Sequence, residues 1–455
     1  MKYESVDPAT GRPVERFAMA TNPELEQAIA AAASAFIAWR ERPLAVRTGF
    51  VSRIADLLEE RAAELAGVMA TEMGKPVAEG KAEVGKCAWV CRYYAEHAAA
   101  FLAQVHKESD GAGAWVRHDP LGPILAIMPW NFPFWQFFRF AAPALAAGNV
   151  TLLKHSPNTP RCARRIEQLV LEAGLPEGVV RNLFLTDGQA ATAIADPRVR
   201  GVTFTGSTAG GKQVAAVAGA HMKPIVLELG GSDPFIVFDD ADLDRALETA
   251  VTSRCLNNGQ SCIAAKRFLV QGSVFDDFRD GLVERMRSLV MGDPSEPGVQ
   301  LGPLARRDLR DRLAEQVTRS IAAGAQALCG GTVPDRDGFY YPATVLVDAP
   351  PGSPAAAEEL FGPVATLFCF ETEDDAVAGA NATGYGLGAG VWTADRNRAE
   401  RMVRDIESGA VFVNGLVKSD PRLPFGGVKD SGHGRELGRE GMLEFVNRKT
   451  VWIGP

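Results

Sequence analysis

The chain has 455 residues, 46% of them hydrophobic and 23% charged, which is typical of a globular protein with two or more domains. Its net charge of −8 argues against a nucleic-acid-binding function. The seven cysteines are scattered, the N-terminus lacks an apolar leader, and no run reaches about 18 apolar residues. We therefore expect a protein of the reducing cytoplasm, without a disulfide framework and without membrane association.

The first hundred residues are predicted to be mainly helical after an extended, turn-rich start at 7–11. Asn22 suits a helix N-cap with Pro23 in the first turn, and Ala-rich periodic sequence follows over 22–39, 43–73 and 76–105. Cys87 and Cys91 lie four residues apart, which raises the alternative of a metal site. No second ligand pair completes a tetrahedral set, and neighbouring aromatic residues favour packing instead. We expect no metal.

From residue 114 onward, strand-like and helix-like segments alternate. A short strand at 114–118 precedes the Leu-Gly-Pro turn at 121–123. Further strands are predicted at 124–128, 150–153, 180–185, 202–205 and 225–229, with helices at 133–147 and 159–173. This alternation predicts an α/β fold with a parallel sheet covered on both faces.

A glycine-rich turn, Gly206 to Gly211, joins the predicted strand at 202–205 to a helix. Glycines at a helix N-terminus leave backbone N–H groups free to bind phosphate, as in Rossmann-type folds. The dinucleotide fingerprint is incomplete because Thr208 stands at its third position, where the second glycine belongs. A nucleoside-triphosphate loop would need Ser or Thr after Lys212, where Gln213 stands. The pattern therefore favours a dinucleotide pyrophosphate.

A second α/β unit is predicted from Asp233 onward. Its strands are predicted at 235–238, 268–271, 343–347, 364–370, 389–392 and 410–413, and its first helices at 242–256 and 274–290. The apolar C-terminal segment 450–453 needs a partner strand. We expect it to pair with 114–118 or with another subunit.

The best candidates for chemistry are Cys262 and Glu228. Cys262 ends the polar turn 257–262, and Glu228 ends an apolar strand that two glycines follow. A thiol nucleophile and a carboxylate base are the groups needed to attack a carbonyl and hydrolyse the resulting thioester. The alternatives are a buried structural cysteine and a carboxylate in a salt bridge.

The motifs together resemble the aldehyde dehydrogenase superfamily over essentially the whole chain. The segments that carry this resemblance are 129–133 (PWNFP), 153–154 (LK), 204–207 (FTGS), 227–231 (LELGG), 258–262 (NGQSC), 358–363 (EELFGP) and 424–427 (PFGG). Within the superfamily, segments 153–158 and 418–425 are similar to the short bacterial succinate-semialdehyde dehydrogenases.

The resemblance implies an aldehyde dehydrogenase-like fold with a Rossmann-type cofactor domain, an α/β catalytic domain and a small β oligomerisation arm. The corresponding residues are 1–106 and 121–230 for the NAD(P)-binding domain, 231–430 for the catalytic domain, and 107–120 and 431–455 for the arm. An arm of this kind implies a homodimer or homotetramer.

The resemblance also implies roles for individual residues. Cys262 would attack the aldehyde, the Asn131 amide and the Cys262 N–H would hold the oxyanion, and Glu228 would activate water. Glu359 would bond the nicotinamide ribose, Phe361 would pack beside it, and Lys154 would reach the adenosine ribose. The cofactor-binding set is Trp130, Lys154, Ser156, Pro157, Gly206, Ser207, Glu359 and Phe361. For each, the alternative is a helix cap or a surface charge.

The chain departs from the family pattern at two positions. NAD-specific members carry a glutamate three residues after the lysine, where this chain has Pro157. Lys154 can pair with a 2′-phosphate, and the stretch 154–157 contains no acid, so we expect that no carboxylate opposes Lys154 and that NADP is favoured over NAD. Some succinate-semialdehyde enzymes carry an arginine six residues before the cysteine, where this chain has Leu256.

Substrate recognition is assigned to Arg139, which interrupts an apolar run eight residues after Asn131. We expect it to bind the distal carboxylate of succinate semialdehyde, with help from Ser419, Arg422 and the segment around Phe425. The alternative is an internal salt bridge. The competing functions are a broader oxidation of medium-chain or ω-carboxylated aldehydes and a non-catalytic binding protein. Intact Cys262, Glu228 and Asn131 argue against the latter.

Overall fold

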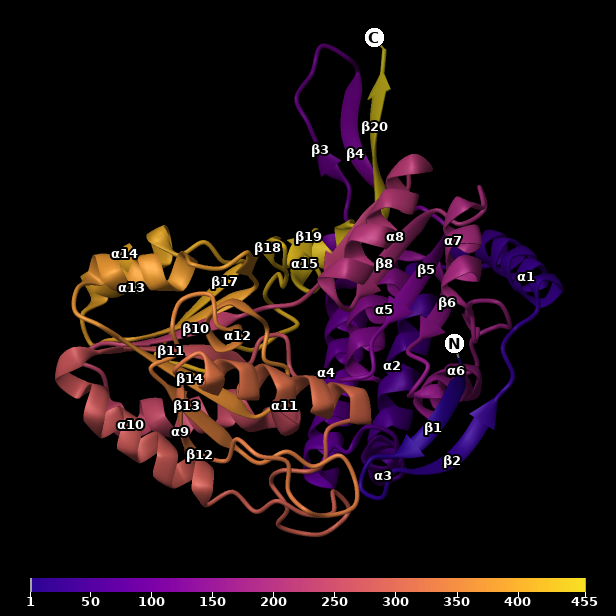
Figure 1. The fold of residues 1–455 in the computed structure, drawn as a ribbon. Coiled ribbons are helices and arrows are strands. Elements are labelled where there is room, and N and C mark those ends of the chain that lie inside the picture. The colour runs from indigo at the N-terminus through magenta and orange to yellow at the C-terminus, as the bar shows by residue number, and fades with distance from the viewer. Residues whose placement is uncertain (1, 455) are drawn as a thin grey trace.

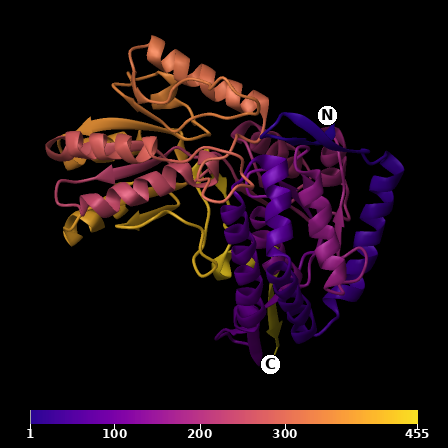
Figure 2. The same cartoon turned by 90° about the horizontal axis from the view of Figure 1, so that it is seen from below.

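The computed structural model describes residues 2–454 and confirms an α/β architecture built on two large sheets. Figure 1 shows the sheets in two bodies that lie side by side, with a narrow sheet projecting from one of them. The two bodies are also separate when viewed from below in Figure 2. Within residues 2–454, every helix is too short or too polar to cross a lipid bilayer.

The first body contains a six-stranded sheet in the order β19, β9, β8, β5, β6, β7. The strands are parallel except that β19 runs antiparallel to β9. Their bounds are β5 (Pro123–Met128), β6 (Val150–His155), β7 (Val180–Asn182), β8 (Gly201–Thr205), β9 (Ile225–Glu228) and β19 (Gly432–His433). β5, β6 and β8 are buried along their whole length, as expected for a parallel sheet covered on both faces.

Helices cover both faces of this sheet. They are α1 (Asn22–Arg40), α2 (Leu44–Glu60), α3 (Ala62–Met73), α4 (Val77–Phe101), α5 (Trp135–Ala147), α6 (Pro160–Glu172), α7 (Asp187–Ala195), α8 (Thr208–Ala220) and α15 (Gly438–Leu443). The N-cap of α1 is Thr21 and not the predicted Asn22, because the Thr21 and Glu24 side chains form a reciprocal capping box. α4 packs against α2, α3 and α5, which places its buried face beside the residues that follow β5.

The second body contains a seven-stranded sheet in the order β12, β13, β14, β11, β10, β16, β17, parallel except for β12. Its strands are β10 (Asp233–Val237), β11 (Ala265–Gln271), β12 (Gln326–Cys329), β13 (Thr344–Val347), β14 (Val364–Phe370), β16 (Gly388–Trp392) and β17 (Ala410–Val413). Its helices are α9 (Leu243–Cys255), η1 (Leu256–Gly259), α10 (Gly272–Arg287), α11 (Arg307–Ala322), α12 (Pro354–Ala357), α13 (Glu373–Asn381) and α14 (Arg396–Asp405). β12 was not predicted from the sequence.

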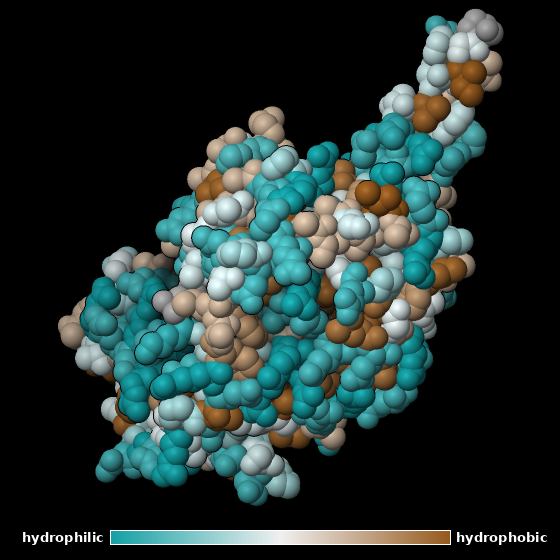
Figure 3. Space-filling view, turned by 90° about the vertical axis from the view of Figure 1, so that its right-hand side faces the viewer, coloured by the Kyte–Doolittle hydropathy of each residue, from teal (hydrophilic) through white to brown (hydrophobic). Residues whose placement is uncertain are grey.

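The projecting sheet consists of β3 (Val105–His106), β4 (Gly113–Pro120) and β20 (Val446–Ile453). β20 pairs antiparallel with β4 within the same chain, which confirms the predicted partner of the C-terminal segment. Figure 3 shows hydrophobic residues among hydrophilic ones along this arm, and Trp452 and Ile453 are half exposed. β19 at 432–433 lies in the six-stranded sheet, so part of the segment assigned to the arm belongs to the first body.

Two small two-stranded sheets complete the fold. The extended start forms the hairpin of β1 (Tyr3–Asp7) and β2 (Arg12–Phe17). β15 (Tyr385–Gly386) pairs with β18 (Val428–Lys429), which connects the second body to the C-terminal segment.

Candidate active site

Cys262 lies just after η1, in a loop held by buried amide side chains. Asn257, Asn258 and Gly259 all have left-handed φ values of 58°, 56° and 72°. The Asn258 amide donates to the carbonyls of Gly74 and Pro303 at 2.8 and 2.9 Å and accepts from Gly302 N–H at 2.7 Å. The amides are therefore tethers that fix an unusual backbone, which asparagine tolerates better than most residues. The sequence had suggested only a polar surround for an accessible thiol.

Two cavities meet at Cys262. A cavity of about 590 Å³ is lined by Trp130, Asn131, Thr205–Thr208, Cys262, Glu359 and Phe361, among others. On the other side, a cavity of about 180 Å³ is lined by Phe132, Trp135, Arg139, Cys262, Ser419 and Phe425, among others. The first is large enough for part of a dinucleotide. The second is small and largely apolar, as a site for a short substrate requires. The thiol therefore faces both a cofactor-sized and a substrate-sized space.

Asn131 lies beside Cys262 in the larger cavity, as the proposed oxyanion ligand must. Its amide donates to the Gln260 carbonyl at 3.0 Å, and its own carbonyl accepts from the Asn257 amide at 2.7 Å. These bonds link Asn131, on the loop after β5, to the cysteine loop of the other body. An amide nitrogen carries two N–H donors, so one remains for an oxyanion.

Burial raises the pKa of the Cys262 thiol to about 12, with Glu228 and Glu359 acting in the same direction. Arg139 and Lys266 oppose this shift. The Lys266 ammonium donates to the Cys262 carbonyl at 2.8 Å and to the Ser261 carbonyl at 3.2 Å, and it lies 3.6 Å from Glu359. Lys266 therefore both positions the cysteine loop and favours the thiolate. The sequence analysis did not identify Lys266, although a lysine four residues after the cysteine is a signal that could have indicated it.

Glu228 ends β9 as predicted and is fully enclosed, with a side chain only 3% exposed. Burial raises its pKa well above the usual range, Arg139 opposes the rise, and Glu436 adds to it. Arg139 lies 3.8 Å from Glu228 and forms an ion pair with Glu436. Because burial raises the pKa of this carboxyl, its carboxylate form takes up a proton more readily than that of an ordinary glutamate, as a general base requires.

The residues around the larger cavity fit a nicotinamide dinucleotide. Glu359 accepts from Gly231 N–H at 3.0 Å, and the Trp130 and Phe361 rings meet edge to face at 5.7 Å. Gly206 and Ser207 lie before α8, and they line the cavity together with Thr208 and Ala209 of its first turn. The Ser207 hydroxyl accepts from Gly210 N–H at 3.2 Å, so it acts as a helix cap in this structure.

The other predicted cofactor residues are engaged with the protein. Lys154 pairs with the exposed Asp187 at 3.3 Å, so the expectation that no carboxylate opposes it was wrong. That acid is 33 residues away in sequence, at the start of α7, and only the fold brings it close. The Ser156 hydroxyl donates to Asn158 at 2.7 Å, and the Pro157 carbonyl accepts from Glu4 N–H at 3.1 Å.

The predicted substrate residues separate into two groups. Ser419 and Phe425 line the smaller cavity, as expected. Arg139 also lines it, but its charge is met by Glu436 and Glu228, and its guanidinium lies 5.0 Å from the Phe425 ring. This is the internal salt bridge that the sequence left as the alternative. Arg422 pairs with Asp420 at 2.6 Å and stacks over Trp89, outside the residues that line the cavity.

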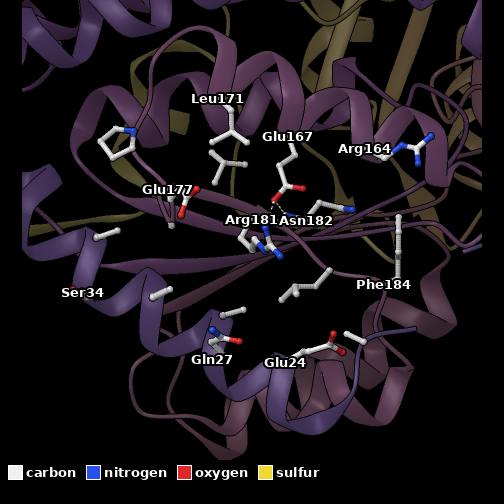
Figure 4. A pocket seen from close by; sticks show the side chains of 18 of the residues that line it. Glu24, Gln27, Ser34, Arg164, Glu167, Leu171, Glu177, Arg181, Asn182 and Phe184 are labelled. Atoms are coloured by element: carbon white, nitrogen blue, oxygen red, sulfur yellow. Dashed lines mark hydrogen bonds and ion pairs between the residues drawn. The ribbon is translucent and has the colours of Figure 1, made fainter. Parts of the chain in front are cut away.

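A third cavity lies away from Cys262. Figure 4 shows it between α1, α6 and β7, with a volume of about 910 Å³. Two of its lining cations are paired with acids, Arg164 with Glu15 at 3.2 Å and Arg181 with Glu167 at 3.3 Å, and the third, Arg42, lies over the Trp39 and Phe50 rings. This cavity is larger than the two at Cys262, but neither of the proposed catalytic residues, Cys262 and Glu228, lines it. We therefore assign the chemistry to the two cavities at Cys262.

A thiol between a dinucleotide-sized cavity and a small apolar one, with a buried carboxylate nearby, defines a cofactor-dependent oxidoreductase that works through a cysteine. The chain belongs to the aldehyde dehydrogenase family, whose model matches residues 1–451. This confirms the resemblance on which the residue roles were based.

Similar proteins were found both by sequence and by structure. A protein of Synechocystis sp. described as a probable succinate-semialdehyde dehydrogenase [NADP(+)] is 49% identical over 453 residues, covering 100% of both chains. Succinate-semialdehyde dehydrogenase [NADP(+)] 1 of Mycobacterium tuberculosis is 49% identical over 456 residues, also covering 100% of both. The crystal structure of succinic semialdehyde dehydrogenase from Streptococcus pyogenes in complex with NADP+ superimposes with a TM-score of 0.97 at 35% identity, covering 100% of both chains.

Proposed function

We propose that the chain oxidises succinate semialdehyde to succinate with NADP as the preferred hydride acceptor, through a thioester on Cys262. The observation that carries this proposal is the position of Cys262, which lines both the cofactor-sized cavity and the short apolar one. Relatives that match over their whole length and bear this activity in their names support the substrate and the cofactor.

The steps follow from the groups around the thiol. The Cys262 thiolate adds to the aldehyde carbon, and the Asn131 amide with the Cys262 N–H stabilises the oxyanion. A bound NADP+ would supply the hydride acceptor, and the oxyanion held by Asn131 and the Cys262 N–H would then collapse to a thioester on Cys262. Glu228 then takes a proton from water as the water attacks the thioester carbon, which releases the acid and regenerates the thiol.

Cofactor preference is proposed from the residues after β6. Lys154 supplies a cation, and Pro157 leaves no carboxylate at the position where NAD-specific relatives have one. Asp187 competes for Lys154 but is 80% exposed, so a bound 2′-phosphate can displace it. We therefore propose that NADP is preferred and that NAD is accepted.

The test is reduced-cofactor production by the purified chain, measured at 340 nm, for succinate semialdehyde, butanal and longer aldehydes. NADP and NAD are compared in parallel at each aldehyde. We expect the highest kcat/KM for succinate semialdehyde with NADP. A higher kcat/KM for uncharged medium-chain aldehydes would favour the broader-specificity alternative and contradict the proposal.

We also propose that the chain works as a homodimer or homotetramer, assembled through the arm of β3, β4 and β20. Support comes from its projection beyond the body and from the half-exposed Trp452 and Ile453 on β20 (Figure 1). Light scattering after size-exclusion chromatography measures the mass, and a monomer would contradict this assignment.

The seven free cysteines support a reducing cytoplasmic setting.

A further inference from the structure

The smaller cavity holds a cation that neither the motifs nor the reaction account for. Lys86, on α4, is partly buried and lines this cavity together with Cys262 and Ser419. Its ammonium donates to the Ser419 hydroxyl at 2.7 Å and lies 4.2 Å from the Trp135 ring centroid. Among residues 2–454 these are its polar and cation–π contacts, and no carboxylate pairs with it.

The acids nearest to Lys86 are already engaged. Glu83, one turn earlier on α4, accepts from the N–H groups of Phe134 and Trp135 at 3.0 Å and forms an ion pair with Lys75. Asp420 accepts from Arg422 at 2.8 Å through one carboxylate oxygen and at 2.6 Å through the other. Lys86 therefore has no counterion of its own, although it lies in a largely apolar cavity.

The other cations of the cavity differ from Lys86 in this respect. Arg139 is neutralised by Glu436 and Glu228, and Lys75 by Glu83. Lys418 lines the cavity but is exposed to solvent. An ammonium without a counterion is costly in an apolar surround, and partial burial together with Arg139 lowers the pKa of Lys86 to about 8. An anion entering the cavity would restore the balance of charge.

We propose that Lys86, with the Ser419 hydroxyl bound to it, is the group that holds the distal carboxylate of a short ω-carboxylated aldehyde whose carbonyl lies at Cys262. The assignment rests on the proposed function, and it replaces Arg139 as the principal carboxylate ligand. The Trp135 ring fixes the ammonium from one side, and Ser419 supplies an O–H donor beside it. The cavity volume of about 180 Å³ limits the number of carbon atoms between the aldehyde and the distal carboxylate of the substrate.

The test compares Lys86→Met with Lys81→Met, which removes an exposed lysine from the same helix. The kcat/KM is measured for succinate semialdehyde and for butanal, an uncharged aldehyde of the same carbon count. Loss of a charge-assisted hydrogen bond is expected to lower kcat/KM for succinate semialdehyde roughly 10- to 150-fold, mainly through KM. Butanal should be nearly unaffected or improved, Lys81→Met should match the parent chain, and Lys86→Arg should recover part of the loss.

Two outcomes separate this assignment from the proposed function. If the parent chain fails to oxidise succinate semialdehyde, the proposed function itself is wrong. If the parent oxidises it and Lys86→Met lowers kcat/KM for both aldehydes equally, only the Lys86 assignment is overturned. If Lys86→Met does not fold, as judged by circular dichroism, Ser419→Ala carries the test. It should weaken succinate semialdehyde selectively, and an equal effect on butanal would overturn the assignment.

Discussion

Arg139 can act either as part of an internal ion pair or as a ligand of the substrate carboxylate, and a double variant separates these two roles. The structure places it between Glu228 and Glu436, where it stabilises the ionised form of the proposed base. Replacing Arg139 by Met and Glu436 by Gln together removes the ion pair without leaving Glu436 as an unpaired buried charge, which limits the cost in stability. The activity of the double variant therefore measures how much the attraction between Arg139 and Glu228 contributes to catalysis.

The size of the effect follows from the 3.8 Å separation of Arg139 and Glu228. At an effective dielectric constant of about 20, this attraction is worth roughly 4 kcal/mol. Loss of the Glu436 charge offsets part of it, so we expect the pKa of Glu228 to rise by less than the loss of Arg139 alone would cause. A higher pKa leaves less of the base deprotonated at a given pH, so thioester hydrolysis slows and its rising limb moves to higher pH.

The assay is pre-steady-state cofactor reduction followed by the steady state, measured across pH with succinate semialdehyde and butanal. The burst amplitude should remain, because Cys262 and the oxyanion ligands are still present, while the steady-state rate at pH 7 falls roughly 10- to 100-fold for both aldehydes. A loss confined to succinate semialdehyde would refute this reasoning and restore Arg139 as the carboxylate ligand.

Three further predictions concern the cysteine loop and the cofactor. Lys266→Met should raise the pKa of Cys262 and slow its alkylation by iodoacetamide at a fixed pH, whereas Lys266→Arg should not; unchanged alkylation would dismiss a role for this charge. Pro157→Glu should shift the ratio of kcat/KM values towards NAD, and an unaltered ratio would contradict the assigned ribose contact. Gly259→Ala should lower the free energy of unfolding by more than about 1 kcal/mol in urea denaturation, since φ is +72° and the added Cβ would lie 2.4 Å from Gly362 C; parent-like stability would count against this geometry.

Much of the fold could be predicted from the sequence because its parallel strands are apolar along their whole length. The pairing of β20 with β4 was also predicted, since an apolar terminal segment needs a partner. Thr21 was missed as a cap because Asn22 is equally suitable by type, and only the contact with Glu24 decides between them. β12 is an exposed edge strand whose residues carry a weak apolar signal.

The site residues could be predicted where their role follows from a single sequence motif. They could not be predicted where their role depends on an ion pair with a residue that is distant in sequence. Cys262 and Glu228 stand out by residue type and position. Arg139 was assigned a free charge because Glu436 is distant in sequence, and Lys86 was overlooked because α4 carries many polar residues. Whether a buried cation has a counterion is decided by tertiary contacts, which a single sequence does not display.

The central claim, a thioester on Cys262 hydrolysed through Glu228, is tested most directly by trapping it. Glu228→Gln is mixed with succinate semialdehyde and NADP, quenched in acid, digested and analysed by mass spectrometry, with Cys262→Ala as the control. The account predicts about one reduced cofactor per active site and one succinyl group on the peptide that contains Cys262, with neither in the control. Parent-like steady-state turnover by Glu228→Gln, or a succinyl group on any other residue, would contradict it.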